Sequence, residues 1–229
     1  MNNSFSASTE YFLEEGKPNL RACLNIAFEA AITRDIETIV IFTGVGEGPK
    51  IAIEEYLSVP AYSKVKIIAV TFPYGQIFSG DEGPVEIEID RGTRDLLKEH
   101  DIPLIRAHLP FNPISAHYKS HGILGQDLTL MGNALSIFGG SMSLCVQAAL
   151  MACDAGFLVL GEHVISMTSD TAIIVRTAPT ERLLMEFIVR EILCKPLNLT
   201  IAKGERPYID KASVSTMEPR SMPELLPPE

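Results

Sequence analysis

The chain has 229 residues, of which 46% are hydrophobic and 21% are charged, and it contains no Trp. This composition is typical of a globular protein and excludes a mainly disordered interaction segment. The formal net charge of −10 repels nucleic-acid phosphates and anionic membrane surfaces, so we expect neither a nucleic-acid nor a membrane partner. An anionic ligand must therefore be held locally, by backbone N–H groups or a few basic side chains.

Cysteine usage and the first residues indicate a cytoplasmic protein. The four cysteines are widely spaced without a CxxC pair, so we expect reduced core residues at Cys23, Cys145, Cys153 and Cys194. Residues 1–10 are polar, carry no secretory signal and are expected to be flexible. The apolar run 142–160 contains Gln147 and Asp154, which favour a buried helix over a membrane span.

Helices and strands are expected to alternate through the first half of the chain. Apolar residues at helical spacing predict a helix over 19–33 with Asn19 as its cap. Unbroken β-branched runs predict buried parallel strands over 38–42 and 65–71. Between these strands lies a glycine-rich turn, and Pro49 suits the first position of the helix that follows it to about residue 57.

The second half predicts further alternation. Residues 85–89 fit either an exposed edge strand or the entry to a helix over 91–100. A short strand is expected at 102–107 and a long loop at 109–122. Two buried helices are expected at 125–138 and 143–155. A strand pair at 163–167 and 171–175 and a last helix at 180–194 complete the predicted elements.

This alternation predicts an α/β fold, a three-layer sandwich with a mostly parallel central sheet. One domain is expected over 11–206, followed by a Pro-rich tail or arm at 207–229. The predicted helices carry more apolar surface than one sheet can cover, so we also expect a homo-oligomer, at least a dimer.

In such sheets ligands bind beyond the carboxyl ends of the strands. The strongest signal there is the loop 43–50, because its glycines let the backbone approach an anion at the start of a helix. Its spacing matches neither a P-loop nor a dinucleotide fingerprint. The alternative is a tight turn without a ligand. Glu47 favours this alternative, because it places a negative charge where an anion would bind. If a phosphate binds, Gly44→Val or Gly46→Val should abolish binding while the fold survives.

Two other groups are weaker candidates. Asp170, flanked by hydroxyl residues at a strand start, either accepts a ligand N–H or caps a turn. His108, His117 and His121 lie in one loop with no acidic residue to orient them, so we expect no metal site and leave their role open. No catalytic set is recognisable from spacing.

Several segments in order resemble a known family: Ile39-Val40-Ile41-Phe42-Thr43-Gly44, Ala149-x-Met151-Ala152-x-Asp154-Ala155-Gly156, Asp170-Thr171-Ala172 and Lys195-Pro196. From about residue 11 to 196 the chain is similar to stand-alone proteins related to the C-terminal α/β domain of pyruvate kinase. In pyruvate kinase this domain carries no catalytic residues and binds a sugar bisphosphate at a Ser/Thr-Gly loop, which Thr43-Gly44 matches here, and the stand-alone relatives have no settled activity. The resemblance therefore implies a phosphorylated ligand at Thr43-Gly44 and flavin mononucleotide (FMN) as cofactor. The chain departs from the family at 166–169, which replaces a glycine-rich run, and at Phe72, which replaces a histidine and offers a ring for stacking on a planar ligand.

The expected function is binding of FMN or a sugar-phosphate-like ligand. The alternatives are an enzyme that uses this ligand and an oligomeric scaffold without one. Three loops supply the candidate binding residues: Thr43, Gly44, Val45, Gly46, Glu47, Gly48 and Lys50; Thr71, Phe72 and Pro73; and Thr168, Ser169, Asp170 and Thr171.

Overall fold

A computed structural model describes residues 4–80, 83–111 and 126–197. These residues all belong to one compact unit, which ends at Leu197. The predicted domain end at 206 and the predicted tail at 207–229 lie outside the described residues, as does most of the predicted loop 109–122.

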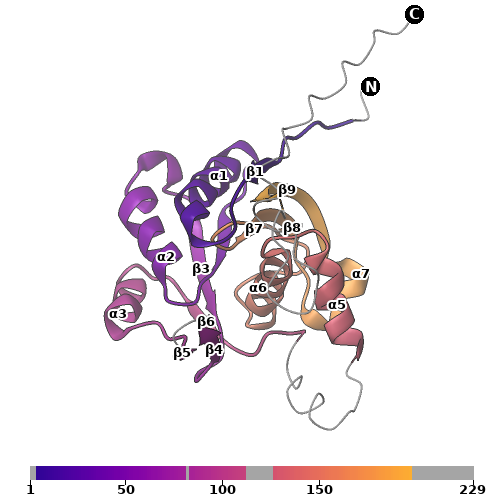
Figure 1. The fold of residues 1–229 in the computed structure, drawn as a ribbon. Coiled ribbons are helices and arrows are strands. Elements are labelled where there is room, and N and C mark those ends of the chain that lie inside the picture. The colour runs from indigo at the N-terminus through magenta and orange to yellow at the C-terminus, as the bar shows by residue number, and fades with distance from the viewer. Residues whose placement is uncertain (1–3, 81–82, 112–125, 198–229) are drawn as a thin grey trace, which may run out of the picture. The chain divides into compact units, whose positions relative to one another are not determined.

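The core of this unit is a seven-stranded sheet in the order β1-β9-β8-β7-β2-β3-β6 (Figure 1). β8 is antiparallel to both of its neighbours, and the other pairs are parallel, so β8 alone runs against the rest of this sheet. The prediction of a mostly parallel sheet is therefore confirmed. The strands of this sheet are β1 (Glu10–Phe12), β2 (Thr38–Phe42), β3 (Lys66–Thr71), β6 (Leu104–Arg106), β7 (His163–Met167), β8 (Ala172–Arg176) and β9 (Ile188–Pro196).

Alternate residues of the central strands enter two separate cores. In β2, Ile39 and Ile41 pack with helix α1 (Leu20–Thr33), whereas Val40 and Phe42 pack with helix α6 (Met142–Asp154). Helices α1 and α6 lie on opposite sides of the strands (Figure 1). Both faces of the sheet are covered, as the unbroken apolar runs predicted, and the fold is a three-layer α/β sandwich.

Two predicted helix starts need correction. Helix α1 follows Asn19 as expected, but the Asn19 side chain donates to the Glu14 carbonyl at 2.7 Å instead of capping the helix. Helix α2 (Glu47–Ala52) begins two residues before Pro49, because Gly46 takes a left-handed conformation with φ of 87°. A π-helical turn then carries the chain from Ile53 to Leu57, the predicted end.

The open alternative at 85–89 is resolved in favour of a strand that leads into a helix. Ile77–Gly80 (β4) and Gly83–Glu86 (β5) form an antiparallel hairpin with its own small sheet. Helix α3 then runs from Arg91 to Glu99, where Asp90 caps it by accepting the Thr93 N–H at 3.0 Å. Phe78 of this hairpin packs against Phe72, which follows β3, with 5.0 Å between the ring centroids.

The predicted helix over 180–194 is wrong. A 3-10 turn at Thr180–Arg182 and the short helix α7 (Leu183–Glu186) lead into strand β9. The β-branched Ile188, Val189 and Ile192 suit a strand, and pairing with β8 overrides the helical spacing.

Helix α5 (Gln126–Ser136) forms as predicted but is not buried, since Leu130 is 66% exposed. Within the described ranges, none of the helices combines the length and apolar character that crossing a membrane requires.

Candidate functional site

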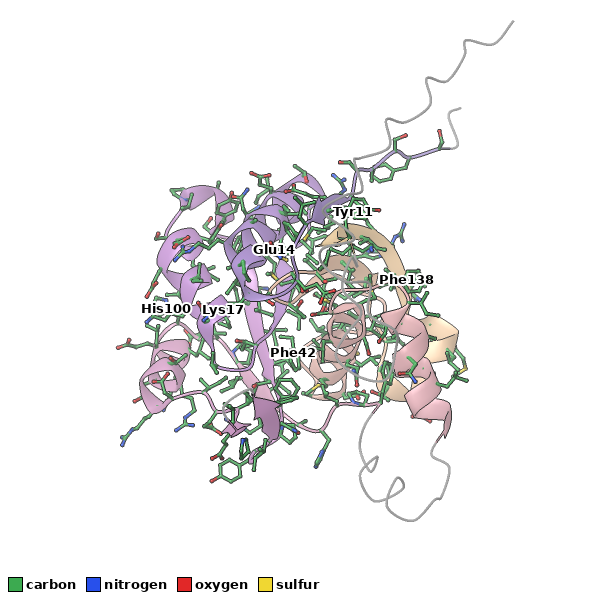
Figure 2. The ribbon with its side chains drawn as sticks, viewed as in Figure 1. Tyr11, Glu14, Lys17, Phe42, His100 and Phe138 are labelled. Atoms are coloured by element: carbon green, nitrogen blue, oxygen red, sulfur yellow. The ribbon has the colours of Figure 1, made fainter. Side chains whose placement is uncertain are left out.

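Three strand ends with threonines define the candidate site. Because β7, β2 and β3 are parallel neighbours, their carboxyl ends meet at one edge of the sheet. Thr168 follows β7, Thr43 follows β2, and Thr71 ends β3, and all three side chains are buried. The structure thus brings together the three loops that sequence analysis selected. Phe42, the last residue of β2, marks this edge in Figure 2.

The loop after β2 leaves backbone N–H groups at the start of α2 without an acceptor among the described residues. The Gly46 N–H donates to the Thr43 hydroxyl at 2.9 Å, which fixes the turn. In the described part of the chain, no acceptor is bonded to the N–H groups of Val45 and Glu47. Val45 is 48% exposed and Glu47 is half-buried, whereas Gly46 and Gly48 are buried. Unpaired N–H groups at a helix start attract anions.

The glycines of this loop also have packing roles. A Cβ on Gly46 would lie 2.5 Å from Thr93 Cγ2, and one on Gly48 would lie 3.0 Å from Ile41 Cγ2. Gly44 is less constrained, since its Cβ would meet Ile87 Cγ2 at 3.2 Å. The expectation that the fold tolerates valine at Gly46 is therefore wrong, because the added side chain would collide with α3 at a left-handed φ.

Sequence analysis missed the N-terminal segment that reaches this edge. Lys17 Nζ lies 2.7 Å from Glu47 Oε2, and the Gly16 N–H donates to Asp170 Oδ2 at 2.7 Å. The Lys17 ammonium, labelled in Figure 2, therefore offsets part of the repulsion that the Glu47 carboxylate would exert on an anion at this loop. Both contacts span large sequence separations, so no local pattern signals them.

Asp170 organises the turn between β7 and β8. Its Oδ1 accepts the hydroxyls of Thr168 at 3.3 Å and Thr171 at 2.9 Å, while Oδ2 accepts the Gly16 N–H. Asp170 as a whole residue is only 3% exposed. Of the two roles considered for Asp170, the structure provides the turn-stabilising one. Ser169 is half-buried at the tip of the same turn.

The loop after β3 presents a different aromatic residue from the one expected. Phe72 packs edge-on between Phe42 at 4.8 Å and Phe78 at 5.0 Å between ring centroids. Tyr74 is 80% exposed, and its ring lies 5.9 Å from the Arg106 guanidinium. Tyr74 is thus the more accessible ring, and Pro73 is half-buried between the two.

The thiols of the core are poorly suited to nucleophilic chemistry. All four cysteines are free, and Cys23, Cys145 and Cys194 are buried. Burial raises the pKa of Cys23 and of Cys145 well above the ordinary value, which keeps both protonated.

No group of three His, Cys, Asp or Glu within the described residues is placed to hold a metal ion. His117 and His121 of the predicted loop lie outside those residues.

Two cavities flank the sheet at other places. One, of about 740 Å³, lies between Lys50 of α2 and the residues Asp90, Thr93 and Lys98 of α3 and its cap. The other, of about 790 Å³, lies at the amino ends of β3 and β6 and is mainly apolar. Of the candidate residues, Lys50 lines the first of these two cavities. No protein-family model matches the sequence.

Proposed function

We propose that the protein binds a phosphorylated small molecule at the carboxyl edge of β2, with the phosphate on the N–H groups of Val45 and Glu47. The observation that carries this proposal is the unpaired backbone at the start of α2, at the edge where α/β sheets bind ligands. Lys17, which contacts Glu47, supplies positive charge at this loop in a chain of net charge −10, whereas Lys50 lies 3.9 Å from the Glu54 carboxylate further along the same helical segment.

FMN is the ligand we propose first, with a sugar-phosphate-like compound as the second. The similarity to stand-alone relatives of the pyruvate kinase C-terminal domain supports FMN, and the three-layer fold is consistent with that similarity. The exposed Tyr74 ring offers a flat apolar surface for a flavin at the same edge. Free thiols are consistent with a cytoplasmic location.

The matched pair FMN and riboflavin tests this function, because the two differ only in the phosphate. We expect FMN to bind at least about tenfold more tightly in calorimetry, since charge-assisted hydrogen bonds hold the phosphate. Glu47→Gln should raise the affinity for FMN, because it removes a carboxylate beside the phosphate; misfolding cannot raise an affinity. Equal binding of FMN and riboflavin would contradict the proposal.

We also propose that the chain forms a homo-oligomer. Apolar side chains are widely exposed in the segment from α5 to β9, including Leu130, Ile137, Leu184, Met185 and Ile188. Light scattering at micromolar concentration should give at least the mass of a dimer, and the mass of one 25.1 kDa chain would refute this.

A further inference from the structure

The outer edge of strand β3 is unpaired near the start of the strand. The Lys66 N–H donates to the carbonyl of Glu37, just before β2, at 2.7 Å. The Ala69 N–H donates to the carbonyl of Pro103, just before β6, at 2.9 Å. Because hydrogen bonds alternate between the two sides of a strand, Ile67 directs its N–H and C=O groups to the β6 side. Pairing with β6 begins only at Ala69, so neither backbone group of Ile67 has a partner in the described part of the chain.

Two residues of the facing segment explain this gap. Asp101, just after helix α3, has a left-handed φ of 54°, and its N–H donates back to the Lys98 carbonyl at 3.2 Å. The chain is therefore still turning where β6 would have to accept from the Ile67 N–H. Pro103 has no N–H group that could donate to the Ile67 carbonyl. Ile67 is 4% exposed, and buried backbone groups cost free energy unless water or a ligand pairs with them.

Ile67 lines the mainly apolar cavity of about 790 Å³. Cavities that bind small molecules commonly measure roughly 300–1,000 Å³. Both cores of the sheet contribute walls, since Leu97 and Ile102 belong to the core on the α1 side and Ile68 to the core on the α6 side. Phe157, in the turn after α6, is 52% exposed and adds an aromatic ring to the lining. A flat molecule in the plane of the sheet would thus have apolar side chains on both faces and the Ile67 N–H and C=O groups at its edge.

The length of the unpaired edge favours a small ring over a peptide strand. It offers one N–H and one C=O group, between Lys66, which bonds to the β2 side, and Ala69, where β6 begins. At about 3.3 Å per residue, this stretch measures roughly 10 Å. A longer strand from another chain would collide with β6, whereas a heterocycle of one or two rings has the right size. Adjacent acceptor and donor atoms on one side of such a ring match the N–H and C=O groups of a single residue.

We propose that this cavity binds a flat one- or two-ring heterocycle that carries a C=O group next to an N–H group, as a 6-oxopurine base does. The Ile67 N–H donates to the ring carbonyl, and the Ile67 C=O accepts the ring N–H. His100, another residue of the lining, marks the position of the cavity in Figure 2. The cavity lies at the amino ends of β3 and β6, so the inference does not depend on the phosphate proposed at the carboxyl edge.

Two nucleosides that differ in one hydrogen-bond donor test the inference. Inosine carries an N1–H group beside its C6 carbonyl, and in 1-methylinosine a methyl group replaces that hydrogen. In backbone amide NMR, inosine at about 1 mM should shift the amide signal of Ile67, because this N–H acquires an acceptor. The affinity for 1-methylinosine should be at least about tenfold lower, because the methyl group leaves the Ile67 carbonyl unpaired.

A matched pair of variants tests where the ring lies. Phe157→Ala removes part of the cavity wall and should weaken inosine binding at least about threefold. Because Phe157 is half-exposed, this change leaves the buried cores intact. Val159→Ala alters a residue of the same turn that is 72% exposed and does not line the cavity, so it should bind inosine as wild type does.

Equal affinity of the wild type for inosine and 1-methylinosine would overturn the inference, as would an Ile67 amide signal that inosine leaves in place. In either case only water pairs with the backbone groups of Ile67. Unchanged inosine affinity in Phe157→Ala would likewise overturn it, because the ring would then lie outside this cavity.

Discussion

Asp170→Ala is expected to lower the free energy of unfolding by about 3 kcal/mol, because three donors lose their common acceptor. The Gly16 N–H and the hydroxyls of Thr168 and Thr171 all point at this buried carboxylate. The change also releases the N-terminal segment from the turn between β7 and β8. Denaturant unfolding followed by circular dichroism measures the effect.

Two variants of the same turn provide controls for Asp170→Ala. Asp170→Asn keeps one carbonyl oxygen as an acceptor and should cost about 1 kcal/mol. Ser169→Ala changes a half-buried side chain at the tip of the turn and should leave stability within about 0.5 kcal/mol of wild type. If Asp170→Ala is as stable as wild type, the Asp170 carboxylate does not stabilise this edge of the sheet. Asp170 would then again be a candidate for ligand binding.

Gly46→Ala is expected to cost about 3 kcal/mol of stability, from two separate causes. The left-handed φ of 87° disfavours any L side chain, and the new Cβ would lie 2.5 Å from Thr93 Cγ2. Gly75 is a control position that has the left-handed φ without the collision. Its φ is 72°, and no atom lies within 4 Å of the place where a Cβ would be added. Gly75→Ala should therefore cost only about 1 kcal/mol.

The collision can be relieved without touching the loop. Thr93→Ser removes Cγ2 but keeps the hydroxyl that donates to Asp90 Oδ2 at 2.6 Å. When Thr93→Ser is added to Gly46→Ala, the free energy of unfolding should rise by at least about 1 kcal/mol. Thr93→Ser alone should not raise the free energy of unfolding of the wild type. If the double variant is no more stable than Gly46→Ala, the packing of the loop against α3 is not what requires glycine here.

Local patterns predicted the central layers well. The buried strands at 38–42 and 163–167 and the apolar helices at 20–33 and 142–154 carry strong, unbroken signals, and both faces of the sheet are covered as expected. The segment 188–196 failed because Ile188 and Ile192 are four residues apart, a spacing that fits a helix, while only β8, a partner elsewhere in the chain, selects a strand.

The candidate site was predicted in outline but not in its charges. Parallel strands bring Thr43, Thr71 and Thr168 to one edge, which follows from topology alone. The contact of Lys17 with Glu47 depends on how an irregular segment folds over that edge. Such a contact has no periodic signal, so sequence reasoning considered Glu47 as an unbalanced charge.

Backbone amide NMR during addition of FMN locates the ligand phosphate relative to the loop after β2. FMN should shift the amide signals of Val45 and Glu47 most strongly, because their unpaired N–H groups acquire an acceptor. Riboflavin at the same concentration should leave these two signals in place. If FMN instead shifts Gly92 and Thr93 beside the cavity at α3 while Val45 and Glu47 stay unchanged, the phosphate does not bind at the loop after β2.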